Sequence, residues 1–108
     1  MSSHLSDIIS ALMDRDYLLT LHIWENFATE YNRPPPSSII SSVRNDKPEI
    51  LENYPNDPRG ACCLILSEST NGKKIHSVVT YGERPVRIIT AYYPSPDIWS
   101  NDRERRSK

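Results

Sequence analysis

The stretch from Tyr54 to Trp99 constrains the fold of this chain more than any other part of the sequence. It contains three runs rich in β-branched and apolar residues, at 62–67, 74–81 and 86–93. Turn-forming residues separate these runs, namely Thr-Asn-Gly at 70–72 and Gly-Glu-Arg-Pro at 82–85. Short runs of this kind between turn signals are typical of strands joined as hairpins. We therefore expect successive antiparallel strands in the second half of the chain.

The first half has helical periodicity instead. Apolar residues spaced i, i+3, i+4, i+7 and i+8 predict an N-terminal helix over about residues 5–15, and they are Leu5, Ile8, Ile9, Leu12 and Met13. Residues 17–22 indicate a short strand or an extended segment that leads into a second helix, which we expect over about residues 23–31. The consecutive prolines at 34–36 end that helix, because proline lacks the backbone N–H that a helix interior needs.

A third helix follows the prolines, with Ser37 or Ser38 as its N-cap. Residues 49–54 then indicate one more strand. Helices first and antiparallel strands after them predict an α+β domain, with two to three N-terminal helices packed on one face of a small, mainly antiparallel sheet.

Size and composition limit the class of protein. A chain of 108 residues has room for one hydrophobic core, so we interpret residues 1–108 as one domain with a frayed tail at 100–108. No apolar run approaches the ~20 residues of a membrane span, and the N-terminus lacks the basic start of a signal peptide. Adjacent Cys62 and Cys63 match no zinc-binding spacing, which favours buried, reduced thiols in a cytoplasmic protein.

The net charge of −1 conceals a difference between the two halves of the chain. Residues 1–58 contain four Lys or Arg against nine Asp or Glu, whereas residues 59–108 contain nine against five. A basic sheet face for phosphate beside acidic helices would explain this difference. An uneven scatter of surface charges, with four of the basic residues in the C-terminal tail, would explain it equally well.

The faces of the expected hairpin depend on its register. A simple turn at 82–85 would place Thr80 opposite Arg87. His76 and Arg87 would then share one face, with Thr90 and Tyr92 on the other, so that all four could not line one site in the middle of the sheet. A slip of one residue would reverse this assignment.

Four segments together resemble a family of small bacterial proteins related to the RelE-like toxins, whose genes often lie beside an antitoxin of the MqsA zinc-finger type. The segments are Leu19–His22, Glu49–Leu66, Gly72–Val79 and Ile89–Trp99. The resemblance covers about the last four-fifths of the chain. It implies a RelE- or MqsR-like α+β fold and a role as the toxin of a type II toxin–antitoxin system. Such toxins cleave mRNA without metal, often on the ribosome, and a cognate antitoxin silences them.

The implied reaction is attack of an RNA 2′-hydroxyl on the adjacent phosphate, which requires a base, an acid and a cation. Histidine and tyrosine can transfer protons, and the candidate catalytic residues are His22, His76 and Tyr92. Arginine and lysine can bind phosphate, and the candidates are Arg59, Arg87 and Lys74. The three histidines lack metal-binding spacing, so we expect neither a metal nor another cofactor. The expected partners are RNA and the antitoxin, with no membrane.

Each candidate also has an ordinary structural interpretation. The histidines and the tyrosine can be packing residues, Arg59 can pair with Asp57, and the other cations can be solvated strand or turn residues. The main alternative function is a catalytically inactive RelE-like interaction module. Asn26 and Glu30 favour that alternative, because they stand where the resemblance implies arginines along the helix. A third interpretation is RNA binding without cleavage.

Overall fold

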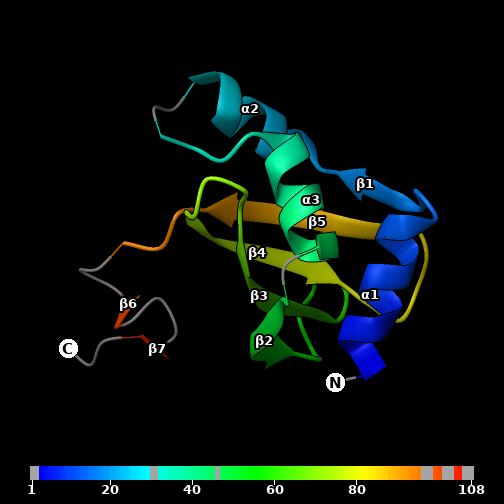
Figure 1. Cartoon of the computed structure of the whole chain (residues 1–108). Coiled ribbons are helices and arrows are strands. Elements are labelled where there is room, and N and C mark those ends of the chain that lie inside the picture. The colour runs from blue at the N-terminus through cyan, green and yellow to red at the C-terminus, as the bar shows by residue number, and fades with distance from the viewer. Residues whose placement is uncertain (1–2, 30–31, 46, 96–98, 101–103, 106–108) are drawn as a thin grey trace.

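The computed structural model describes residues 3–29, 32–45, 47–95, 99–100 and 104–105, and these form an α+β structure (Figure 1). In chain order the elements are α1 (Ser3–Met13), β1 (Tyr17–Leu19), α2 (Leu21–Thr29), α3 (Pro36–Asn45), β2 (Glu49–Tyr54), β3 (Cys62–Glu68), β4 (Lys74–Thr80), β5 (Val86–Tyr92), β6 (Trp99–Ser100) and β7 (Glu104–Arg105). Strands β1 to β5 form one sheet in the order β1-β5-β4-β3-β2. All neighbours are antiparallel except β1 and β5, so the expected fold class is confirmed.

The three helices lie on the same face of the sheet, which we call the front face (Figure 1). Leu12 of α1, Ile23 of α2 and Val43 of α3 are buried there in one apolar cluster with side chains of the central strands. Burying an aliphatic side chain of this size stabilises a fold by roughly 1.5–3 kcal/mol. The N-terminal helix therefore belongs to the core of its own domain, although its last residue, Met13, is 62% exposed.

The opposite side of the sheet, the back face, has a smaller apolar cluster around Cys62, Leu64, Val78 and Ile89. Both cysteines of β3 are free and buried, one on each face. Burial raises the pKa of the Cys63 thiol to about 12 and also raises that of Cys62, so both are held as protonated thiols. Within the part of the chain that the structure describes, no helix is long and apolar enough to cross a bilayer.

Helix α2 begins two residues earlier than the sequence pattern predicts. The expected strand at 17–22 ends at Leu19, and the carbonyl of Thr20 accepts a hydrogen bond from the N–H of Ile23 at 3.0 Å. The hydroxyl of Thr20 donates to the carbonyl of Ile89 at 3.0 Å, which holds this turn against β5. His22 therefore lies in the first turn of a helix and not at the end of a strand. Residues 30–31, where the helix was expected to end, lie outside the described residues.

Helix α3 begins at Pro36, not after a serine cap. The carbonyl of Pro35 accepts hydrogen bonds from the N–H groups of Ser38 and Ile39 at 3.0 and 3.1 Å. Proline suits the first helical position, because its fixed φ is already helical and its missing N–H has no partner there anyway. The proline run that ends the preceding segment thus also starts this helix.

The expected register of the β4–β5 hairpin is wrong for half of its length. Val79 pairs with Ile88 as expected, but Val78 pairs with Thr90, because Ile89 is an extra residue on β5. Such a β-bulge shifts all later pairs by one position. His76 consequently lies opposite Tyr92. Thr90 and Tyr92 therefore share the back face with His76 and Arg87, and the expected separation of these side chains is overturned.

At the C-terminal end, β6 and β7 pair with each other, with Trp99 opposite Arg105. The rest of the tail that was expected to be frayed, at 101–103 and 106–108, lies outside the described residues.

Candidate functional site

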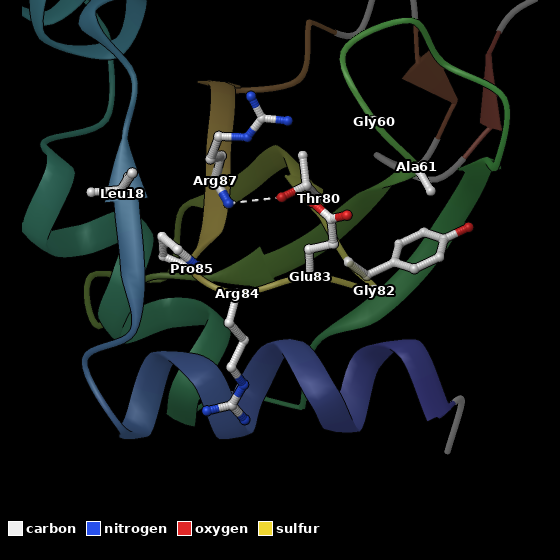
Figure 2. A pocket seen from close by; sticks show the side chains of 10 residues that line it. Leu18, Gly60, Ala61, Thr80, Gly82, Glu83, Arg84, Pro85 and Arg87 are labelled. Carbon is white, nitrogen blue, oxygen red and sulfur yellow. Dashed lines mark hydrogen bonds between the residues drawn. The ribbon is translucent and has the colours of Figure 1, made fainter.

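A cleft of about 620 Å³ opens at the end of the sheet where β4 turns into β5. It is lined by Leu18 of β1, Gly60 and Ala61 before β3, the segment 80–85, and Arg87 of β5 (Figure 2). Its volume lies within the range of small-ligand sites in proteins. Three separate stretches of the chain meet here, because the order of strands brings β1, β5, β4 and β3 side by side.

Arg87 is the cation of this cleft. Its backbone N–H donates to Oγ1 of Thr80 at 2.8 Å, and its guanidinium donates to the carbonyl of Arg59. Among the described residues no carboxylate pairs with this guanidinium. Its remaining donors are therefore available to an anionic ligand, and two parallel N–H groups of an arginine match two phosphate oxygens.

Gly60 allows the loop to approach Arg87 closely. Its φ of +107° is a conformation that residues with a side chain rarely adopt. A Cβ at this position would lie 3.1 Å from Nη2 of Arg87. Glycine at position 60 thus allows the loop to adopt this positive φ and also leaves room for the guanidinium of Arg87.

The other two arginines at this end of the sheet are already paired. The Arg59 guanidinium donates to both oxygens of Asp57 at 2.9 and 3.0 Å, as one interpretation of the sequence held. These hydrogen bonds lower the pKa of Asp57 to about 2. The Arg84 side chain extends towards α1 (Figure 2), and its guanidinium lies 2.9 Å from Asp14 and 3.7 Å from Asp16 in the segment that follows this helix. Arg59 and Arg87 therefore lie close together, but Arg87 alone of the three lacks a carboxylate partner among the described residues.

His76 and Tyr92 form a second group on the back face. Nδ1 of His76 lies 3.3 Å from the hydroxyl of Tyr92, and the two rings are 5.3 Å apart between centroids. His76 is fully buried. Along β4, His76 is four residues away from Thr80, which lines the cleft. Four residues of strand span about 13 Å. The imidazole of His76 therefore contacts neither the cleft nor solvent, and only the half-buried Tyr92 links this group to the surface.

The remaining two predicted site residues lie elsewhere. His22 is exposed on α2, where its Nε2 lies 2.8 Å from Nδ2 of Asn26. Lys74 is at the far end of β4 and is paired with Glu68 at 2.5 Å. The structure brings neither of them to the cleft. Within the described residues, no three His, Cys, Asp or Glu side chains gather in a way that could hold a metal ion.

Neither the carboxylate nor the apolar wall of the cleft is predicted from the sequence. Glu83 lies in the loop interpreted only as a hairpin connection, and its side chain lines the cleft together with Leu18 and Pro85. The one feature of the sequence that could have indicated this carboxylate is the charged Glu-Arg pair at 83–84, because a hairpin loop can form from small turn residues alone.

One family model, described as a domain of unknown function (DUF4258), matches residues 37–93, which is just over half of the chain. These residues span α3 and β2 to β5, and so include Arg59, Glu83 and Arg87 but not α1, β1 or α2. No curated protein and no solved structure matches the chain significantly.

Proposed function

The chain belongs to the DUF4258 family, and we propose that it binds and cleaves RNA as the toxin of a toxin–antitoxin pair. The proposal combines the RelE-like sequence resemblance with one observation: the guanidinium of Arg87 lines the 620 Å³ cleft and has no carboxylate partner among the described residues. Here the Arg59 carbonyl accepts a hydrogen bond from the Arg87 guanidinium, and Thr80 accepts one from the Arg87 backbone N–H. An arginine held in this way in a concave site is suited to an anionic ligand.

In this proposal Arg87 holds the scissile phosphate. The RNA 2′-oxygen attacks the phosphorus atom while its proton passes to water, the bond from phosphorus to the 5′-oxygen breaks, and that oxygen takes up a proton from water. The products are a 2′,3′-cyclic phosphate and a free 5′-hydroxyl. Arg87 would stabilise the negative charge that grows on the phosphate oxygens, and such preorganised electrostatic stabilisation is commonly the largest catalytic contribution. This reaction requires no metal ion.

The test is to incubate the purified protein with a labelled single-stranded RNA in a metal chelator and to identify the ends of the products. We expect 2′,3′-cyclic phosphate ends from the wild-type protein. Hydrogen bonds to a charged group contribute ~1.5–3 kcal/mol. Arg87→Ala should therefore weaken RNA binding by about 10- to 150-fold. The matched control is Arg44→Ala, which removes an exposed arginine of α3 on the helical layer and should change nothing.

Each outcome decides between the alternatives. Binding that depends on Arg87 without cleavage would reduce the function to RNA binding. Neither binding nor cleavage, or equal loss in both arginine variants, would contradict the proposal. Induction of the wild-type gene should arrest growth, and induction of the Arg87→Ala gene should not.

A specific observation supports the second candidate, a non-catalytic interaction module. Three large apolar side chains of α2 are exposed, Leu21 at 70%, Trp24 at 50% and Phe27 at 43%. Adjacent exposed apolar groups of this kind commonly mark protein–protein contacts. The same surface would serve the antitoxin of an active toxin. Calorimetric titration with the product of the neighbouring reading frame tests this role, and Trp24→Ser should weaken that binding while RNA cleavage stays unchanged.

A further inference from the structure

The cleft has two charged side chains of opposite sign, and neither has a charged partner among the described residues. Arg87 is the cation, and Glu83 is the anion. In contrast, the nearby Arg59 and Arg84 are each paired with aspartates. The two unpaired charges do not form a salt bridge with each other, so each remains available to a ligand.

The cleft also has an apolar side. Leu18 is 54% exposed on β1, and Pro85 precedes β5 in the same lining. In Figure 2 these two residues lie to the left of Arg87, and the side chain of Glu83 lies to its right, beside Thr80. A complementary ligand therefore has an anionic group, a flat apolar body and hydrogen-bond donors for a carboxylate.

A nucleotide has all three features, with its phosphate on Arg87 and its base against Leu18 and Pro85. The four bases differ in what they offer to the Glu83 carboxylate. Guanine presents two neighbouring donors, N1–H and the 2-amino group, which match the two carboxylate oxygens. Adenine and cytosine place a ring-nitrogen acceptor beside their amino group, and uracil has one N–H between two carbonyls. Paired charge-assisted hydrogen bonds are stronger and more selective than single ones.

We propose that Glu83 selects a guanosine in the RNA that this cleft binds. The inference rests on the proposed function, because it concerns the same cleft and the same phosphate on Arg87. A good bidentate contact between a side chain and a base discriminates by on the order of tenfold or more against the wrong base. Glu83 is thus a specificity-determining residue, and Arg87 supplies affinity for any sequence.

The probes are four 2′-O-methyl RNA hexamers, which cannot undergo attack by the 2′-oxygen and so report binding alone. One is all uridine, and the others replace its third residue by guanosine, adenosine or cytidine. Fluorescence anisotropy measures the dissociation constant of each. We expect the guanosine hexamer to bind about tenfold or more tightly than the other three. Glu83→Gln should remove this advantage, because an amide has one acceptor oxygen and its NH₂ group would face the donors of guanine.

Two matched variants complete the design. Arg87→Ala should weaken all four hexamers by the same factor, because phosphate is common to them. Glu25→Gln neutralises an exposed carboxylate of α2 and should preserve the preference for guanosine. Circular dichroism checks that each variant is folded.

Some outcomes overturn the inference and leave the proposed function intact. Equal, Arg87-dependent binding of the four hexamers would do so, as would a guanosine preference that survives Glu83→Gln. Absence of binding to every hexamer would overturn the function and the inference together. A dipeptide such as glycylglycine can be added as a competitor of the labelled guanosine hexamer. If it displaces the labelled hexamer at a lower concentration than the unlabelled guanosine hexamer does, the cleft is a peptide site instead.

Discussion

Tyr92 lies directly opposite His76 in the β4–β5 ladder, and its hydroxyl is 3.3 Å from Nδ1 of the buried imidazole. Burial of a polar ring is tolerated because hydrogen bonds replace those that it would make with water. Tyr92→Phe keeps the ring but removes the hydroxyl, so we expect a loss of ~1–2 kcal/mol in the free energy of unfolding, measured by urea denaturation.

The neighbouring tyrosine provides the control. Tyr93 lies under Nζ of Lys73 at 5.0 Å from the ring centroid, a contact that Tyr93→Phe preserves, so this variant should be close to wild type. RNA cleavage per folded molecule should be unchanged in Tyr92→Phe. A loss of cleavage without a loss of stability would instead give the His76–Tyr92 pair a catalytic role.

The sequence predicted the strands well, because strand residues follow a pattern imposed by burial. Glu49–Tyr54 matches β2 in both bounds, and the runs that begin at Cys62, Lys74 and Val86 match the first residues of β3, β4 and β5. The position of the helices on one face follows from their single apolar stripes. These features depend on local periodicity, which a sequence displays directly.

The bulge in β5 could not be read from the sequence. Ile88 and Ile89 are both apolar, and one packs on the front face while the other packs on the back face. Either register of the β4–β5 hairpin therefore buries apolar side chains. Which register forms depends on how side chains pack on both faces of the sheet together. This single extra residue decides whether Tyr92 reaches His76, so the interpretation of the whole back face depended on it.

The cleft was predictable in part. Arg59 and Arg87 were identified as phosphate candidates, and they do meet, but through the carbonyl of Arg59 and not its guanidinium. The pairing of the Arg59 side chain with Asp57 is local in sequence and was foreseen. Glu83 and Leu18 were not, because their relation to Arg87 arises from the parallel pairing of β1 with β5 and from the conformation of a turn.

The Asp57–Arg59 pair predicts a defined pH dependence. Hydrogen bonds from Arg59 lower the pKa of Asp57 from the ordinary 3.8 to about 2 in the folded protein. A depressed folded-state pKa stabilises the fold above the unfolded-state pKa, and this contribution disappears as the pH falls through the folded value. The difference in urea midpoint between the wild type and Asp57→Asn should therefore be constant above about pH 5 and shrink progressively towards pH 2.

Arg59→Gln is the complementary variant, because it removes the other member of the pair and should show the same dependence on pH. The effect should be small, since the Arg59 side chain is 53% exposed and such pairs are screened by water and salt. A difference that persists unchanged at pH 2 would show that Asp57→Asn acts through the shape of the loop and not through charge.

A buried pair of serines connects α3 to the sheet. The hydroxyl of Ser42 donates to the carbonyl of Ile39 at 2.9 Å, so the 2.8 Å contact between Ser42 and Ser67 is donated by Ser67. Ser42→Ala would leave the Ser67 hydroxyl without its acceptor and should cost ~1–3 kcal/mol. Ser67→Ala leaves the Ser42 donor satisfied and should cost less, ~0.5–1.5 kcal/mol.

Urea denaturation of both single variants and the double variant forms a mutant cycle. The double variant should lose less than the sum of the single losses, because both residues take part in one contact. Additive losses, or a larger cost for Ser67→Ala, would contradict the assigned direction of the hydrogen bond.

Alanine substitutions at two glycines with similar backbone conformation can separate the effect of backbone strain on stability from the effect on the position of Arg87. Gly60 has φ +107° and Gly72 has φ +84°, but a Cβ at Gly60 would lie 3.1 Å from Nη2 of Arg87, whereas a Cβ at Gly72 would meet no atom within 4 Å. Alanine at either position should destabilise the fold by ~1–3 kcal/mol through its strained φ. Only Gly60→Ala should also displace Arg87 and weaken RNA binding, by several-fold in anisotropy measurements. Equal RNA affinity in the two variants, at matched stability, would show that Arg87 does not bind the RNA phosphate from this position.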